Sequence, residues 1–247
     1  MKTFVIFLLS LLPLTSQAQN AKGQFSVKPM TGINLSTLGR STFKDMFHMK
    51  TRWTAGFEVE YGLNDWMGLS LGLVYSQQGA KIDGCYYVYG TIDDPAYQYS
   101  LSYIQVEGKL HADYLNFPLM ASIYIPAVKG LSIKAGLQFG ALVNDDAEAK
   151  TTVAYTPVYN ASATRADNNP MSINNPKVQQ LYSIETRQTD VTKAVDFGIP
   201  VGLSYEYKNV ILDARYYFGL TKTDSTTEPD NTRNRNLSIT LGYRFHL

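Results

Sequence analysis

The stretch DFGIPVGLSYEYKNVILDARYYFGL, residues 196–220, carries an apolar side chain at nearly every second position on both sides of a short break. A period of two places the apolar side chains on one face of a β-strand and the remaining side chains on the other. The break at Lys208 and Asn209 is short enough for a tight hairpin turn. The stretch therefore predicts two antiparallel strands, and leaves open which of their faces meets water.

The same alternation recurs along the chain in segments of about ten residues, and the connections between them alternate between short and long. Short turns at one rim and long loops at the other are typical of outer-membrane β-barrels. The pattern predicts an all-β fold, an eight-stranded antiparallel up-and-down transmembrane β-barrel with long extracellular loops, the longest at about residues 79–113 and 143–193. The eight predicted strands are residues 25–35, 52–62, 67–77, 114–125, 131–142, 196–207, 210–220 and 235–247.

The apolar face is predicted to meet lipid, because it runs for five or six positions per strand almost without a polar residue. Aromatic residues mark its ends, as expected of girdles at a lipid–water boundary. Pro118 and Pro200 fall within predicted strands, where each removes a hydrogen-bond donor, and both are expected on the inward face. The aromatic residues that mark the ends are Tyr61, Tyr75, Tyr205, Tyr207, Tyr243 and Phe245.

The N-terminal residues predict export. Residues 1–18 combine Lys2, a short apolar run and a small-residue cleavage site, so we expect a signal peptide followed by one barrel domain over residues 19–247. Without Lys2 the chain has 21 basic and 21 acidic side chains, which argues against nucleic acid as a partner. Cys85 is the single cysteine, so neither an intrachain disulfide nor a cysteine-based zinc site is expected.

Five stretches carry a family resemblance: FSVKPMTGINLSTL, YLNFPLMASIYI, DFGIPVGLSYEY, ARYYFGLTK and NLSITLGYRF. In these the chain resembles the outer-membrane β-barrel family common in the Bacteroidetes, often called the porin family and including the PorT-like proteins. The resemblance implies the outer membrane of a Gram-negative bacterium, with membrane lipid and the barrel-assembly machinery as partners. Such barrels usually end on an aromatic residue that this machinery reads. Here Leu247 is last and Phe245 lies two places earlier, which puts the recognition signal in doubt.

Charged residues of both signs fall on the face predicted to point inward. Eight strands enclose a space just wide enough for side chains to fill, so these charges are expected to pair with one another. A structural salt-bridge core is the favoured interpretation, and a narrow or gated conduit is the alternative. The predicted interior charges are Lys28, Arg52, Lys134, Arg215 and Arg244 with Glu58, Glu60, Asp196, Glu206 and Asp213.

A tyrosine-rich segment around residues 85–106 predicts a hairpin that carries two strands above the membrane. Tyrosine offers a large, rigid and amphipathic contact surface, which favours recognition of a ligand. The alternative is that these tyrosines only pack the two long strands together. The candidate binding residues are Tyr86, Tyr87, Tyr89, Tyr97, Tyr99 and Tyr103.

Catalytic and metal sites are weakly indicated. His111 with Asp113 is the one histidine–carboxylate pair near the outer rim, and no motif of a known hydrolase accompanies it. Asp145, Asp146 and Glu148 have oxygen ligands for Ca²⁺, but a solvated acidic turn accounts for them. We therefore expect no enzyme, cofactor or metal. The favoured function is envelope-structural or surface-binding, toward an extracellular ligand or envelope protein; the alternatives are a porin-like conduit and a PorT-like accessory role in secretion.

Overall fold

The computed structural model of the 247-residue chain describes residues 22–39, 46–90, 97–159, 179–223 and 232–247. The predicted signal peptide lies outside these residues. Among the described residues, no helix is long and apolar enough to cross a bilayer. One sheet contains the strands β1 (Phe25–Gly39), β2 (Phe47–His48), β3 (Lys50–Asn64), β4 (Met67–Gly90), β5 (Tyr97–Tyr124), β6 (Leu131–Tyr159), β7 (Gln179–Gln188), β8 (Val195–Tyr207), β9 (Val210–Gly219), β10 (Arg233–Tyr243) and β11 (Phe245–His246).

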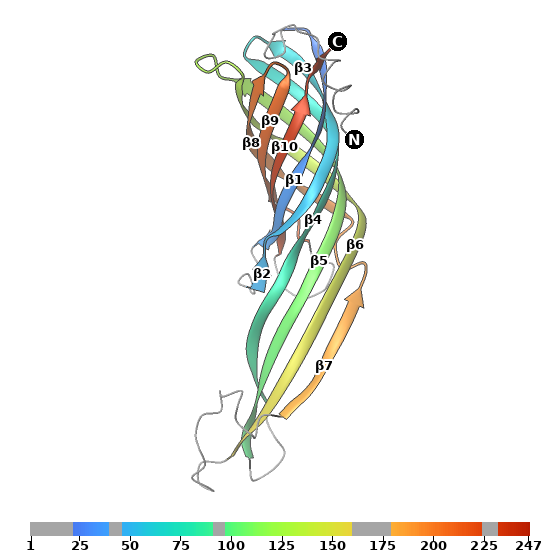
Figure 1. Cartoon of the computed structure of the whole chain (residues 1–247), viewed down its shortest axis with the longest axis vertical. Coiled ribbons are helices and arrows are strands. Elements are labelled where there is room, and N and C mark those ends of the chain that lie inside the picture. The colour runs from blue at the N-terminus through green and yellow to red at the C-terminus, as the bar shows by residue number, and fades with distance from the viewer. Residues whose placement is uncertain (1–21, 40–45, 91–96, 160–178, 224–231) are drawn as a thin grey trace, which may run out of the picture.

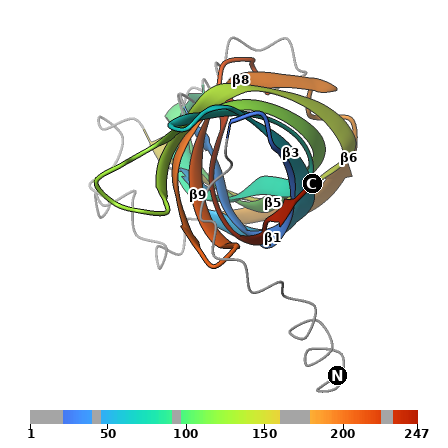
Figure 2. The same ribbon diagram turned by 90° about the horizontal axis from the view of Figure 1, so that it is seen from above.

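Eight of these strands close into a ring, which Figure 2 views nearly end-on. Each strand pairs antiparallel with the next in the order β1, β3, β4, β5, β6, β8, β9 and β10, and β10 pairs back onto β1. β11 continues β10 and also pairs with β1. The predicted eight-stranded antiparallel barrel is confirmed. The ring does not include β2, which pairs with β4, or β7, which pairs with β6.

Three strands run far beyond the ring, as Figure 1 shows. β4, β5 and β6 have 24, 28 and 29 residues, whereas β9 has 10. Residues 97–109 of β5, at about 3.3 Å per residue, carry the sheet roughly 40 Å past the rim. β7 adds a fourth strand beside β6. We call residues 81–90, 97–109, 147–159 and 179–188 the extension.

The extension corrects the predicted boundaries. The hairpin expected around residues 85–106 is present, since β4 pairs with β5 as far as Gly90 and Ser100. The loop predicted over residues 143–193 is wrong in large part, because β6 continues to Tyr159 and β7 occupies Gln179–Gln188. Residue types do alternate along this segment. One face of the strand carries charged residues and the other carries small or apolar residues, so the pattern does not resemble that of a membrane strand.

The burial of the barrel strands is inverted relative to that of a soluble barrel. Leu71 on β4 and Leu203 on β8 are 58% and 54% exposed, whereas the side chains of Glu58 and Lys134 are inside and their residues 1% exposed. The outward face is therefore apolar and the inward face polar, as the uninterrupted apolar face predicts.

The turn between β8 and β9 explains the two-residue break in the sequence. Lys208 and Asn209 have φ angles of 47° and 67°. Positive φ at both central residues is the type I′ geometry that matches the twist of a two-residue hairpin. The Asn209 side-chain amide donates a hydrogen bond to the Arg244 carbonyl at 3.0 Å, and the Arg244 backbone N–H donates to the Asn209 carbonyl at 2.8 Å. The turn is thus fastened to the C-terminal end of the chain.

Both mid-strand prolines point inward and are fully buried. The β4–β5 ladder has no pairing between Leu71–Leu119 and Val74–Asn116, which is where Pro118 lies. The β6–β8 ladder is interrupted in the same way at Pro200. Each proline is still paired with the neighbouring strand on its other side, β6 for Pro118 and β9 for Pro200. Each missing N–H donor therefore weakens a single ladder and does not open the ring.

Candidate functional site

The barrel interior holds a compact cluster of five charged side chains. Lys28 Nζ lies 2.7 Å from Glu58 Oε2 and 3.3 Å from Asp213 Oδ2. Arg215 donates to both carboxylates, at 2.9 Å to Glu58 Oε2 and 2.6 Å to Asp213 Oδ1. Lys134 Nζ lies 3.4 Å from Asp213 Oδ2. Residues from β1, β3, β6 and β9 are therefore joined across the inside of the ring.

A second cluster lies closer to the short-turn end. Arg244 donates to Glu206 Oε2 at 3.0 Å, to Glu60 Oε1 at 2.5 Å and to Ser26 Oγ at 2.9 Å. Tyr124 also donates to Glu60 Oε1, at 2.6 Å. The two clusters together contain four basic and four acidic side chains, so their formal charges cancel. Removing any one of these side chains would leave a buried charge without its partner. The charges therefore stabilise strand packing only when all of them are present.

The interior beside these clusters is largely filled by side chains. A cavity of about 40 Å³ lies next to Arg215, between Pro118 and Pro200. A volume of that size accommodates only a small number of waters. Farther along, Asn34 donates to Ser76 Oγ at 2.8 Å and accepts from Ser238 Oγ at 2.6 Å, which joins β1 to β4 and β10.

Two of the ten predicted interior charges lie apart from both clusters. Arg52 is at the rim beside the extension, where its Nη2 lies 3.5 Å from Asp113 Oδ1 and its Nη1 lies 2.7 Å from His111 Nδ1. Asp196 accepts hydrogen bonds from Asn234 at 2.8 Å and from Thr221 at 2.5 Å. Placing these two in one interior network was wrong. Alternation predicts the face of a residue but not its height along the barrel.

His111 and Asp113 are not arranged as a catalytic pair. A guanidinium only donates hydrogen bonds, so His111 Nδ1 must accept from Arg52. Burial and the neighbouring charges of Lys50 and Arg52 lower the pKa of His111, which favours its neutral form. Asp113 accepts a hydrogen bond from Tyr75 at 2.8 Å and pairs with Arg52. Both side chains are thus held by structural partners.

An apolar cluster lies at the base of the extension. Leu38, Ala80 and Leu110 are buried against one another, and they come from β1, β4 and β5. Partly buried Phe47, Ala147 and Val191 pack against them. The cluster covers the interior where the strands leave the ring.

Asp145 fastens the connection between β7 and β8 to this cluster. Its carboxylate accepts the backbone N–H groups of Asp190 at 2.9 Å and Thr192 at 2.7 Å. Asp190 has a φ of 60°, so its backbone is in the left-handed region and depends on such a partner. The acidic residues expected in a solvated turn instead lie in β6, where Asp146 pairs with Arg187 at 2.7 Å.

We expect the Asp145→Ala variant to open this connection locally. The substitution leaves two backbone donors without their acceptor, which costs about 1–3 kcal/mol for each donor that stays buried. Limited proteolysis at Lys193 should accelerate by roughly tenfold or more, while the heat-modifiable migration of the barrel stays the same. Asp83→Ala, at an exposed position of β4, is the matched control. Equal proteolysis of the two variants would contradict the anchoring role.

The predicted tyrosine surface is divided between two faces of the extension. Tyr87 and Tyr103 are paired across β4 and β5, with ring centroids 5.3 Å apart. Tyr86 is adjacent to Tyr87 in the same strand and therefore lies on the opposite face. Tyr86 and Tyr87 are 37% and 44% exposed. The backbones of Tyr89, Tyr97 and Tyr99 belong to β4 and β5, but their side chains lie outside the described residues.

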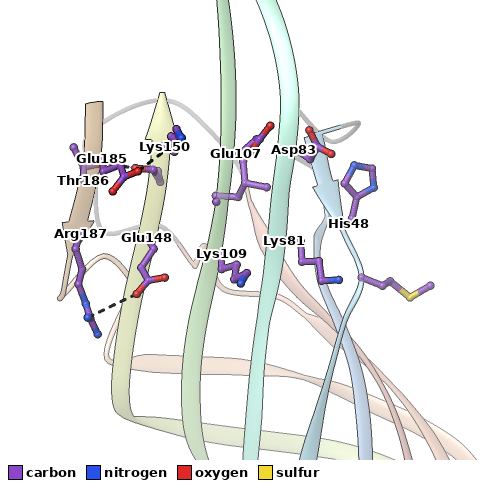
Figure 3. Close-up of a pocket in the computed structure, with 14 residues that line it drawn as sticks. His48, Lys81, Asp83, Glu107, Lys109, Glu148, Lys150, Glu185, Thr186 and Arg187 are labelled. Atoms are coloured by element: carbon purple, nitrogen blue, oxygen red, sulfur yellow. Dashed lines mark hydrogen bonds and ion pairs between the residues drawn. The ribbon is translucent and has the colours of Figure 1, made fainter. Parts of the chain in front are cut away.

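The same face as Tyr87 and Tyr103 carries two rows of charged residues, which Figure 3 shows. The row nearer the barrel contains Lys81, Lys109, Glu148 and Arg187, which are register neighbours on β4, β5, β6 and β7. The next row contains Asp83, Glu107, Lys150 and Glu185. These residues border a hollow of about 970 Å³ that also includes His48 and Met49.

These rows were not predicted, although the sequence contains a signal for them. Asp146, Glu148 and Lys150 alternate with Ala147 and Ala149, which is a strand pattern with one charged face and one small face. Lys81 and Asp83 show the same spacing. A search for apolar alternation alone passes over such segments.

Within the described ranges, no three His, Cys, Asp or Glu side chains are arranged to hold a metal ion. Cys85 is exposed on the extension.

The closed ring, its apolar exterior and its polar interior agree with a sequence comparison. The family profile described as outer membrane protein beta-barrel domain matches residues 17–225. The chain belongs to this family. A barrel of this family resides in the outer membrane of a Gram-negative bacterium, where short turns face the periplasm and long connections face outward. The extension of this barrel therefore stands on the cell surface.

Solved structures of several small outer-membrane barrels are similar to the chain. Ail, the attachment invasion locus protein of Yersinia pestis, is 14% identical over 91% of this chain and 99% of its own, with a TM-score of 0.40. Neisserial surface protein A is 15% identical over 92% and 100%, with a TM-score of 0.41. The N-terminal β-barrel domain of Pseudomonas aeruginosa OprF is 12% identical over 92% and 100%, with a TM-score of 0.31. A comparison with curated proteins found no match.

Proposed function

We propose that this outer-membrane barrel is a non-enzymatic surface-binding protein that engages an extracellular ligand or an envelope protein through the extension. The observation that carries the proposal is the continuation of β4, β5 and β6 beyond the ring, with β7 added at their side. A barrel that only spans the membrane needs strands of about 9–11 residues, so this length serves something outside the bilayer.

The side chains of the extension suit recognition. Tyr87 and Tyr103 form an aromatic pair beside two rows of charged residues that border a hollow. Aromatic anchors surrounded by polar groups are the usual composition of binding surfaces. Among the described strands β7 pairs with β6 alone, so its other edge also offers backbone hydrogen-bonding groups to a partner strand.

The barrel itself is unsuited to conduction. Four basic and four acidic side chains pair across the interior, which gives an ion neither an open path nor a lining of one sign. We therefore expect the folded mature protein to give no single-channel steps in a planar bilayer, with heat-modifiable gel migration as the check for folding. Stable, reproducible steps from the folded species would contradict this proposal and favour the conduit.

The resemblance to PorT-like proteins suggests envelope proteins as partners, and the same extension would contact them. Cross-linking of intact cells with a membrane-impermeant reagent tests both kinds of partner. Cross-linked species that contain other envelope proteins would support an accessory role in secretion, and a lone monomer would weaken it.

A further inference from the structure

The charged row nearer the barrel contains two lysines that face each other without an acidic partner. Lys81 and Lys109 lie directly opposite on β4 and β5, and both are exposed. Like charges in opposite positions of a sheet repel each other. Within the described part of the chain, neither ammonium has a carboxylate within the 4.0 Å of an ion pair.

The carboxylates at the height of the two lysines are already paired with arginines, and Asp83 and Glu107 lie one row farther from the barrel. Asp146 accepts two hydrogen bonds from Arg187, at 2.7 and 3.2 Å, and Glu148 lies 3.7 Å from the same arginine. Asp113 pairs with Arg52. The row nearer the barrel, which lies closest to the membrane, therefore carries an excess of positive charge.

A third lysine adds to this positive charge. Lys50 borders a hollow of about 590 Å³ together with Lys81 and Lys109, and its Nζ donates to the Leu110 carbonyl at 3.2 Å. Burial lowers the pKa of Lys50 to about 8, with Arg52 and Lys109 as further causes. Lys50 therefore lies close enough to Lys109 for their positive charges to repel each other.

The strands place this site directly above the lipid-facing surface. On β4 the outward residues include Leu69, Leu71 and Tyr75, and Lys81 lies an even number of positions after each of them, so it is on the same face. The β4–β5 ladder has no register shift that would turn the face over. Lys109 likewise lies eight positions before the outward-facing Phe117 on β5, and therefore on the same face. The lysines thus continue the surface that contacts lipid.

The height of the lysines fits the polar layer of the membrane. Lys81 lies six positions after Tyr75, and strands tilted by about 40° rise roughly 15 Å over that span. Met49, which is 64% exposed, borders the same hollow and adds an apolar contact. A site with cationic groups above a lipid-facing belt matches a phosphorylated amphiphile better than a soluble anion.

We propose that Lys81, Lys109 and Lys50 bind the phosphate groups of the phosphorylated glycolipid that forms the surrounding outer leaflet. The site holds the membrane-proximal base of the extension against the bilayer surface. It lies nearer the membrane than the Tyr87–Tyr103 pair, which we take as the centre of the proposed ligand-binding surface.

Titration of the folded mature protein with diphosphoryl lipid A, followed by native mass spectrometry, tests this site. We expect the double variant Lys81→Gln/Lys109→Gln to bind about 30-fold more weakly than the wild type, since each cation near an anionic lipid surface contributes about 1 kcal/mol, or about fivefold. The double variant Lys81→Arg/Lys109→Arg should bind like the wild type. Lys150→Gln is the matched control, because Lys150 lies one row farther out and is paired with Glu185 at 3.8 Å.

Two further arms separate the possible sources of phosphate. The same lipid A after enzymatic removal of its phosphates should bind as weakly to the wild type as the diphosphoryl form binds to the glutamine variant. Inorganic pyrophosphate at equal phosphate concentration should not displace the lipid. Equal binding of both lipid forms, unchanged binding by the glutamine variant, or full displacement by pyrophosphate would each overturn the proposal.

Discussion

The Glu58→Ala variant is expected to lose about 3–5 kcal/mol of the free energy of unfolding, the usual effect of breaking a buried ion pair by removing one partner. Glu58 is 1% exposed and accepts from both Lys28 and Arg215. Without it, Asp213 alone faces three cations inside the ring. Urea unfolding in phospholipid vesicles measures the effect, with the fluorescence of exposed Trp53 and Trp66 as the signal.

Two further variants show whether lost charge balance is the cause. Glu58→Ala/Lys28→Met removes one charge of each sign and should recover a substantial part of the loss, because the remaining interior charges again cancel. Glu185→Ala removes an exposed carboxylate of the extension and should change stability by less than about 0.5 kcal/mol. If Glu58→Ala unfolds at the same urea concentration as Glu185→Ala, the interior clusters do not hold the ring together.

Removing the outer part of the extension is expected to abolish surface binding while the barrel still folds. The strand registers define the variant: Asn-Gly replaces residues 84–106 between Asp83 and Glu107, and a second Asn-Gly replaces residues 151–184 between Lys150 and Glu185. Asn-Gly is the preferred sequence for a two-residue hairpin turn. The ring pairings and both interior clusters remain intact, so heat-modifiable migration should be retained.

Binding is followed by membrane-impermeant cross-linking on intact cells. The yield of cross-linked partner should fall by about 30-fold or more, the equivalent of losing one binding hot spot of about 2 kcal/mol. A control variant carries Asn-Gly in place of Lys208 and Asn209, at the opposite end of the barrel, and should cross-link like the wild type. Unchanged cross-linking by the shortened protein would remove the extension from the proposed function. Lipid A binding should persist in this variant, since Lys81 and Lys109 are kept, so the two proposals fail independently.

Much of the barrel could be predicted because the two-residue alternation that indicates each strand lies within that strand. The alternation along residues 196–220 predicts two strands and their faces, and Lys208 with Asn209 predicts the turn between them. Lipid outside and polar groups inside also follow, since an uninterrupted apolar face needs an apolar solvent. The tyrosine-rich hairpin is likewise present. The paired continuation of β6 and β7 was missed, because charged and small residues alternate there in place of apolar and polar ones.

The sequence alone determined the eight strands of the ring, their two faces and the membrane that surrounds them, because strand geometry repeats every two residues. Only the tertiary structure decided which charges meet. Lys28 and Asp213 are 185 positions apart, and they come together because β1 and β9 lie on either side of β10 in the closed ring. Arg52 and Asp196 have the same inward pattern, but the strand registers place them at other heights. Strand register and ring closure are set by all eight strands together, so no single segment encodes the contacts across the interior.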